Sequence, residues 1–238
     1  MFSLPNILTI LNLTCGCIAL FGIFYETSVV VIIAFILALV FDFLDGFTAR
    51  ILGQSSELGK QLDSFADLIS FGVFPTFLFI DIVERSTDLI SWPIYGLIFL
   101  LTAGAALRLA RFNMDESDSS GFTGLPSPAM AITAFGIWIN LDNSVFPSLE
   151  VLGDPSFVLI LSLALTLFMN LPLRFIKFSP GRDFTLNQVL SIILILIFIG
   201  GLFLNWKISV LITAVSYFIL SLLLPLFTNT KQSTRSNF

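Results

Sequence analysis

Long apolar segments occupy most of the chain and constrain its fold more than any other feature. A helix that crosses a bilayer needs roughly 17–25 apolar residues, and we read about eight such segments, two of them short. They are Pro5–Tyr25, Ser28–Ile51, Gln61–Val83, Leu89–Phe112, Pro128–Leu141, Ser156–Leu171, Leu186–Leu204 and Ile208–Phe227. Only 11% of the 238 residues are charged and 56% are hydrophobic, a composition typical of membrane proteins. We therefore predict an all-α, polytopic membrane helical bundle of about eight transmembrane helices, forming a single domain over residues 1–238.

The distribution of lysine and arginine predicts how this bundle is oriented. Cytoplasmic loops carry an excess of these residues, and a cytoplasmic N-terminus places nine of the eleven there. The nine are Arg50, Lys60, Arg108, Arg111, Arg174, Lys177, Arg182, Lys231 and Arg235, whereas Arg85 and Lys207 fall outside. This predicts an integral protein of the cytoplasmic (inner) membrane with both termini inside. No removable signal peptide is expected, because the N-terminus lacks a basic region. The outer loops then carry acidic residues that we interpret as solvated charges, namely Asp81, Glu84, Asp88, Asp142, Glu150 and Asp154.

Two residue types narrow the chemistry. The chain has no histidine, which excludes Ser-His-Asp and Cys-His catalysis, His-ligated zinc and a histidine base. Its two cysteines, Cys15 and Cys17, lie within an apolar segment and indicate buried thiols, not a disulfide framework. No basic patch stands out, so nucleic-acid binding is not expected.

Four aspartates interrupt the apolar pattern at regular spacings. Asp42 and Asp45 share one face of a predicted helix, and Asp63 and Asp67 share one face of the next. An intramembrane carboxylate costs several kcal/mol unless it is paired or bound to a metal. Solvated helix ends would explain the residues less well, because the carboxylates keep to one face and do not spread around each helix. We therefore expect two neighbouring helices to bring the four carboxylates together as a functional site.

Such a cluster of oxygen ligands suits hard divalent cations, Mg²⁺ or Mn²⁺, whose coordination is often completed by substrate phosphates. Two cations would balance four carboxylates and leave positions open for a pyrophosphate. Gly46 and Gly59 lie on the same helix faces and leave room for a large ligand close to the backbone. Arg50, one turn beyond Gly46, supplies a planar cation suited to phosphate oxygens.

The residues from Asp42 to Asp67 follow the pattern D-x2-D-G-x2-A-R-x8-G-x3-D-x3-D, which resembles the signature of the CDP-alcohol phosphatidyltransferases. The resemblance implies transfer of a phosphatidyl group from a CDP-linked lipid, usually CDP-diacylglycerol, to an alcohol, with release of CMP. It also implies that Asp42, Asp45 and Asp63 hold two metals. By the same resemblance, Asp67 contacts the metal site and acts as the general base, and the protein is a homodimer in the lipid bilayer. The site would then face the cytoplasm.

The resemblance also assigns residues to the CDP-linked lipid. Four of them come from the signature itself, namely Gly46, Ala49, Arg50 and Gly59. Ser56, in the linking turn, either matches a hydroxyl that touches the donor in relatives or is an ordinary turn serine. Asn6 and Thr9, near the cytoplasmic end of the first helix, either approach the nucleotide or serve the helix end.

Three further stretches, Ser64–Gly72, Ala106–Asn113 and Phe122–Ala129, resemble the phosphatidylserine synthase branch of this family. They imply that L-serine is the acceptor. The carboxylate of serine needs a cation, and Arg108 and Arg111 lie three residues apart near a cytoplasmic helix end. Asn113 and Ser127 would add hydrogen bonds. Both arginines can equally be interpreted as positive-inside anchors that reach the lipid headgroups.

Two alternatives stay open. Glycerol 3-phosphate or inositol phosphate as the acceptor would keep the same chemistry, and the basic residues Arg108, Arg111, Arg174 and Lys177 do not exclude a phosphate pocket. An ion transporter would use the carboxylates as a permeation site. That second alternative leaves Gly46, Arg50 and Gly59 unexplained at their spacing.

Overall fold

The computed structural model describes residues 3–54, 56–86, 92–114, 124–141, 147–173, 175–176 and 186–233, with side chains up to residue 224. The described residues are nearly all helical. In chain order the elements are α1 (Leu4–Phe24), α2 (Ser28–Leu52), α3 (Glu57–Leu68), η1 (Ile69–Val73), α4 (Phe74–Ser86), α5 (Trp92–Ile98), α6 (Leu100–Met114), α7 (Ser127–Leu141), η2 (Pro147–Gly153), α8 (Pro155–Asn170), α9 (Leu186–Leu202) and α10 (Trp206–Ser233).

Five helical stretches among the described residues are long and apolar enough to cross a membrane. Two of these stretches are composite, because Glu57–Ser86 joins α3, η1 and α4, and Trp92–Met114 joins α5 and α6. Three further apolar helices, α7, α8 and α9, are shorter than a typical span. The structure therefore has the character of a polytopic, all-helical membrane protein, and the number of about eight crossings stays a prediction.

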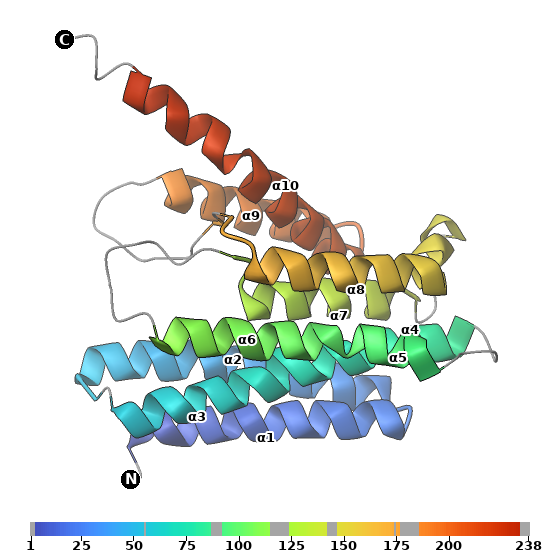
Figure 1. The fold of residues 1–238 in the computed structure, drawn as a ribbon, viewed down its shortest axis with the longest axis horizontal. Helices are drawn as coiled ribbons and strands as arrows, with labels where there is room; N and C mark the ends of the chain where they lie inside the picture. The colour runs from blue at the N-terminus through green and yellow to red at the C-terminus, as the bar shows by residue number, and fades with distance from the viewer. Residues whose placement is uncertain are drawn as a thin grey trace.

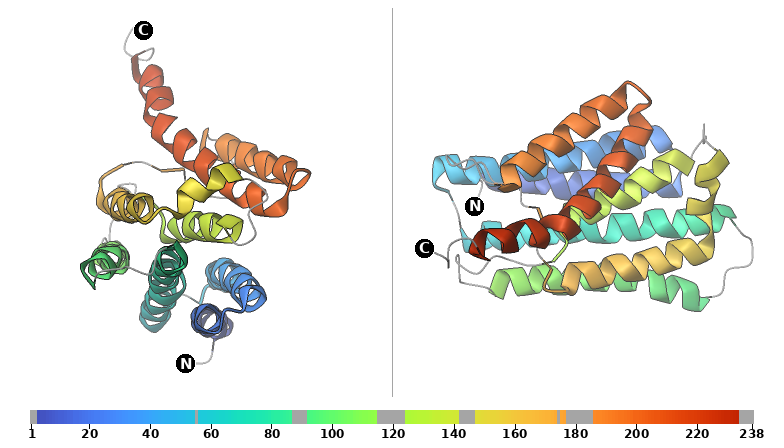
Figure 2. Two further views of the ribbon diagram at one scale, coloured as in Figure 1. Left: turned by 90° about the vertical axis from the view of Figure 1, so that its right-hand side faces the viewer. Right: turned by 90° about the horizontal axis from the view of Figure 1, so that it is seen from above.

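Helices α1 and α10 lie on opposite flanks of the bundle, with the other helices between them (Figures 1 and 2). The hairpin of α1 and α2 packs together with α3 on one side. On the other side α10 packs against α7 and α9, and its last turns lead away from the bundle (Figure 2). Buried aromatic residues such as Phe35, Phe74 and Phe135 fill the interior between these groups. Because α1 packs against both α2 and α3, aspartates of the sequence motif on α2 and α3 lie close together.

A short π-helix, η1, follows α3 without a break. The sequence analysis did not predict it. Helix α1 lies so close to η1 that a side chain on Gly16 would collide with the hydroxyl of Ser70. This hydroxyl donates a hydrogen bond of 3.2 Å to the backbone carbonyl of Asn12. π-Turns often occur at functional sites, and η1 begins only two residues after Asp67.

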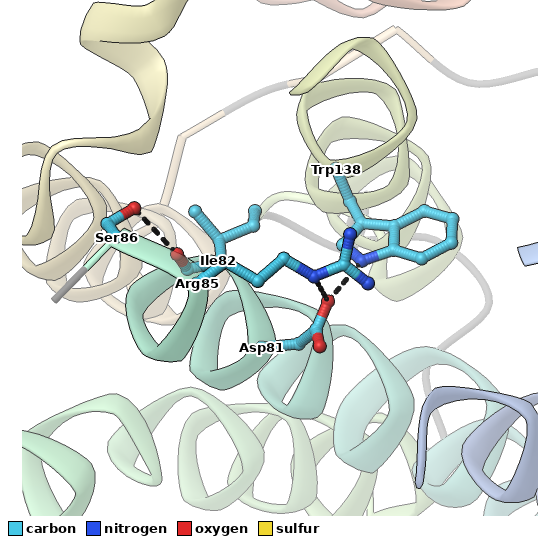
Figure 3. A network of polar contacts seen from close by, with 5 residues as sticks. All are labelled: Asp81, Ile82, Arg85, Ser86 and Trp138. Carbon is cyan, nitrogen blue, oxygen red and sulfur yellow. Dashed lines mark hydrogen bonds and ion pairs between the residues drawn. The ribbon is translucent and has the colours of Figure 1, made fainter. Parts of the chain in front are cut away.

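Asp81 corrects one interpretation made from the sequence. It is not a solvated loop charge, because it lies in α4 and its Oδ2 atom accepts a hydrogen bond of 2.6 Å from Nε1 of Trp138 (Figure 3). The same oxygen lies 2.9 Å from Nε of Arg85, and the guanidinium of Arg85 lies 5.6 Å from the centre of the Trp138 ring. These three contacts link Asp81 and Arg85 of α4 to Trp138 of α7.

Asp154 is an exposed loop residue, as interpreted from the sequence, and it is also the N-cap of α8. Its Oδ1 atom accepts hydrogen bonds from the backbone nitrogens of Ser156 and Phe157, at 2.9 and 3.1 Å. Glu84 accepts a hydrogen bond of 3.0 Å from the hydroxyl of Tyr95. Several other charges used to orient the chain lie outside the described residues, namely Asp88, Asp142, Arg174, Lys177, Arg182 and Arg235.

Candidate metal centre and nucleotide pocket

Three carboxylates meet where α2 and α3 face each other. Asp42 comes from α2, and Asp63 and Asp67 come from successive turns of α3. Each offers one carboxylate oxygen, and the three oxygens all lie within 4.8 Å of one another. The carboxyl groups of Asp42 and Asp67 thus face each other across the two helices. The i, i+4 spacing on α3 produces this arrangement, because residues four apart lie one above the other on a helix.

Asp45 lies beside this group and not within it. Its side chain is buried, and its Oδ2 atom accepts a hydrogen bond of 2.7 Å from the hydroxyl of Thr9 on α1. It still lies within electrostatic range of Asp63. The structure therefore brings three of the four predicted carboxylates into one cluster and ties the fourth to α1. It also gives Thr9 a definite partner where the sequence left two roles open.

The cluster fits a hard divalent cation on three grounds. Its ligands are carboxylate oxygens, the type that Mg²⁺ and Mn²⁺ prefer. The like charges of Asp42, Asp63 and Asp67 are packed together in a partly buried place, which is unfavourable without a compensating cation. Finally, Oδ1 of Asp67 is buried and has no hydrogen-bond partner among the described residues. An oxygen of this kind is available to a cation.

A pocket of about 510 Å³ opens beside the carboxylates. Its lining comes from the start of α1, the end of α2 and the start of α3, and consists of Pro5, Asn6, Thr9, Asp45, Gly46, Ala49, Gln54, Ser56, Glu57, Gly59, Lys60 and Asp63. Five of the six residues assigned to the CDP-linked lipid are among them, the exception being Arg50. The lining also includes Gln54 of the turn between α2 and α3 and Lys60 of the first turn of α3, which no motif in the sequence indicated, because single polar residues near a helix end carry no periodic signal.

Arg50 and Ser56 border this pocket in different ways. A Cβ built on Gly46 would lie 3.6 Å from Nη1 of Arg50, so the guanidinium reaches back along α2 towards the pocket. Ser56 is the N-cap of α3, and its Oγ atom accepts a hydrogen bond of 3.0 Å from the backbone nitrogen of Gly59. A Cβ on Gly59 would lie only 3.0 Å from Oδ1 of Asn6. Gly59 therefore allows α3 to begin close to α1.

Arg108 and Ser127, two of the residues predicted to bind serine, contact each other. Arg108 is 9% exposed, and its Nη1 atom donates a hydrogen bond of 2.9 Å to Oγ of the fully buried Ser127. Arg108 also interacts electrostatically with Asp67 and with Tyr217 of α10. The guanidinium therefore connects the carboxylate cluster to the second half of the chain.

The turn that presents Ser127 is held by its backbone. Gly124 has a φ angle of +105°, which favours glycine. Its nitrogen donates a hydrogen bond of 2.7 Å to the carbonyl of Leu173, and the nitrogen of Leu125 donates one of 2.9 Å to the carbonyl of Phe168. The end of α8 thus fixes the start of α7 beside Arg108.

The other two residues predicted to bind serine lie elsewhere. Arg111 is exposed, and its Nη1 atom donates a hydrogen bond of 3.4 Å to the backbone carbonyl of Asn170. Asn113 donates a hydrogen bond of 2.7 Å from Nδ2 to the hydroxyl of Ser64. The backbone carbonyl of Asn113 accepts a hydrogen bond of 3.1 Å from Nζ of Lys60. These contacts join the end of α6 to α8 and to α3.

The chain belongs to the CDP-alcohol phosphatidyltransferase family, whose pattern matches residues 2–172. It is therefore an enzyme of that class. The chain is 35% identical over 127 residues to a CDP-diacylglycerol–serine O-phosphatidyltransferase of Bacillus subtilis, covering 52% of this chain and 69% of the relative. It is 38% identical over 146 residues to a protein of the same name from Methanocaldococcus jannaschii, covering 57% and 63%. An archaetidylserine synthase of Methanothermobacter thermautotrophicus is 33% identical over 141 residues, covering 58% of each chain. The last two are thus matched over less than two thirds of their length.

Proposed function

We propose that this chain transfers the phosphatidyl group of CDP-diacylglycerol to the hydroxyl of L-serine, giving phosphatidylserine and CMP. The observation that carries the proposal is the position of the buried Arg108, which interacts electrostatically with Asp67 of the carboxylate cluster. Its guanidinium is a cation close to the proposed base, and a cation of this kind can bind the carboxylate of serine. The names of the three relatives point to the same acceptor.

In this proposal the four aspartates hold two divalent cations, Mg²⁺ or Mn²⁺. Asp42, Asp63 and Asp67 contribute the oxygens that already lie together, and Asp45 contributes from beside Asp63. When bound, the cations offset the negative charge of the pyrophosphate and of the departing CMP. Because three of the carboxylates already lie together, the site would need little rearrangement before the reaction, and such prearranged charges favour the transition state.

Asp67 is the proposed general base. The serine oxygen forms a bond to the phosphorus that carries diacylglycerol, the bond from this phosphorus to the CMP oxygen breaks, and Asp67 accepts the hydroxyl proton. Its buried Oδ1 atom has no hydrogen-bond partner among the described residues. That oxygen is therefore available for a proton or a cation.

The pocket beside the cluster is the proposed place of the nucleotide. Asn6, Gly46, Ala49, Ser56 and Gly59 line it, and Arg50 lies next to Gly46, where it can bind a phosphate. The acyl chains would stay among the exposed apolar side chains of the bundle, such as Phe43 and Phe47 on α2. The donor then needs no extraction from the bilayer.

For the acceptor, we propose that Arg108 binds the serine carboxylate and that Ser127 holds the guanidinium in place. Arg111 and Asn113 would act through the end of α6, which their contacts fasten to α8 and to α3. We further propose a single domain over residues 1–238, a homodimer, and a site that faces the cytoplasm.

The test is release of CMP by purified full-length protein in detergent, supplied with CDP-diacylglycerol and Mn²⁺ or Mg²⁺. L-serine, glycerol 3-phosphate and inositol phosphate are compared as acceptors. We expect release that depends on serine and stops when a chelator is added. Release with a phosphorylated acceptor alone would keep the family chemistry and overturn the serine assignment. Cation flux through liposomes without CDP-diacylglycerol would favour the transporter.

A further inference from the structure

Asn12 is a fully buried amide at the centre of α1. It is 0% exposed, and neither Oδ1 nor Nδ2 has a hydrogen-bond partner among the described residues. Buried polar groups are nearly always paired, and a buried amide that is not paired destabilises the fold. Asn140 of α7 shows the usual situation, since its Nδ2 atom donates to the carbonyls of Gly136 and Lys207 at 2.7 and 2.8 Å.

Contacts with α2 place Asn12 at the depth of the carboxylates. The helices α1 and α2 form an antiparallel hairpin in which Thr9 bonds to Asp45 and Gly22 lies against Val31. From the first of these contacts, Asn12 is three residues further along α1, and Asp42 is three residues back along α2. Both steps amount to a rise of about 4.5 Å in the same direction. Asn12 and Asp42 therefore lie at the same level.

Contacts with α3 and η1 give the same depth independently. Gly59 lies against Asn6, and Ser70 donates its hydrogen bond to the carbonyl of Asn12, so α3 runs alongside α1 in the same direction. Asp63 and Asp67 lie between these two contacts. Ser70 is three residues beyond Asp67 and seven beyond Asp63, so Asn12 lies closer to the level of Asp67 than to that of Asp63, on the α1 side.

The close approach of Gly16 to Ser70 fixes this part of α1 against η1. Asn12 lies one turn before Gly16 on the same helix face as Thr9, whose side chain points to Asp45. The amide is thus on the side of α1 from which Thr9 reaches Asp45, and it has no hydrogen-bond partner among the described residues.

We propose that Asn12 is a positioning residue of the cation site, and that its amide pairs with the water shell of a divalent cation bound by the aspartates. Mg²⁺ and Mn²⁺ keep several water molecules when bound by carboxylates. An amide beside them offers an acceptor to water hydrogens and two donors to carboxylate oxygens. This inference rests on the cation site of the proposed function and adds a residue outside the sequence signature.

The test measures Mn²⁺ binding by the full-length protein in detergent without any substrate. The electron paramagnetic resonance signal of free Mn²⁺ reports how much of the ion is bound. Asn12→Leu is compared with Asn140→Leu. We expect Asn12→Leu to weaken Mn²⁺ binding at least about tenfold, the lower end of the effect of outer-shell partners. Its thermal midpoint without metal should be unchanged or higher, because an unpaired amide is removed. Asn140→Leu should lower that midpoint and leave Mn²⁺ binding unchanged.

Three results would overturn the inference. The first is an unchanged Mn²⁺ affinity of Asn12→Leu. The second is a lower thermal midpoint of metal-free Asn12→Leu as the only effect of the substitution. The third is a raised KM of this variant for serine with an unchanged Mn²⁺ affinity. If the leucine variant does not fold, Asn12→Ser takes its place. Failure of the wild-type protein to use serine would count against the proposed function alone, because Mn²⁺ binding is measured without substrate.

Discussion

The aspartates in and beside the carboxylate cluster differ in what surrounds them, and this difference underlies the roles that we propose for them. Asp45 is bonded to Thr9 and lines the pocket. Asp67 lies deeper, outside the pocket lining, with Arg108 in electrostatic range. In the proposed function, Asp45 therefore serves the donor, and Asp67 lies between the donor pocket and the proposed acceptor residue Arg108.

Asp67→Asn should lower the rate of CMP release by about 10²- to 10⁴-fold, the usual contribution of a general base. Binding of CDP-diacylglycerol should be largely kept, because Asp67 does not line the pocket. Both quantities can be measured on the same purified variant. The matched control is Glu150→Gln, an exposed residue of η2, which should leave both unchanged. Full activity of Asp67→Asn would remove Asp67 as the base.

Arg108→Lys keeps the positive charge but loses the planar fork that binds a carboxylate through two hydrogen bonds. We expect the KM for serine to rise about tenfold or more, while Mn²⁺ affinity changes little. Steady-state kinetics with varied serine measure this. Arg85→Lys is the control, because Arg85 contacts Asp81 and Trp138 and has no place in the proposed site, and its KM should stay close to that of the wild type. An equal rise in both variants would contradict the assignment of Arg108.

At the scale of helices, the close packing of α1 on η1 sets the geometry of the cluster. The packing depends on the absence of a side chain at Gly16. The π-turn itself follows α3 directly, so any shift of α1 would be passed to Asp67 at the end of α3.

Gly16→Ala should therefore lower both stability and activity. Overpacking of this kind costs about 1–3 kcal/mol, which thermal unfolding in detergent would detect together with reduced CMP release. Gly200→Ala is a matched control in α9, since a Cβ there would meet no atom within 4 Å. That control should be as stable as the wild type or more so, because alanine favours helix. A stable and active Gly16→Ala variant would show that α1 can move without harm.

The sequence predicted the helices and the donor end of the site better than the acceptor end. Asp42, Asp63 and Asp67 were predictable because helical spacing alone places them on facing surfaces. The π-turn was not predictable, since apolar residues such as Ile69 and Val73 fit an α-helix equally well. The amide of Asn12 was missed for a similar reason, because one polar residue in an apolar span has no period. The pairing of Asp81 with Trp138 depends on how α4 and α7 pack, which local sequence does not determine.

On the scale of the whole molecule, the carboxylate cluster and the contact of Ser86 with η2 mark opposite ends of the bundle. The hydroxyl of Ser86 at the end of α4 donates a hydrogen bond of 2.7 Å to the carbonyl of Gly153. Gln54 lines the pocket near the aspartates. These two regions therefore should lie on opposite sides of the membrane.

Thiol labelling in intact cells would test that orientation. In a background with Cys15 and Cys17 replaced by alanine, we expect Glu150→Cys to react with an impermeant reagent added outside. Gln54→Cys should react only after the membrane is permeabilised, because positively charged loops stay in the cytoplasm. The reverse pattern would invert the proposed topology.

The residues proposed to bind the donor and those proposed to bind the acceptor are distributed differently along the sequence. The donor end is contained in one continuous stretch, Asp42–Asp67, with support from the start of α1. The proposed acceptor residues Arg108 and Ser127 come from two other helices, and Arg108 interacts electrostatically with Tyr217 of a third. Mutations can therefore alter acceptor choice without disturbing the residues that activate the donor. In this proposal a new headgroup specificity requires substitutions only among the acceptor residues, while the stretch Asp42–Asp67 stays unchanged.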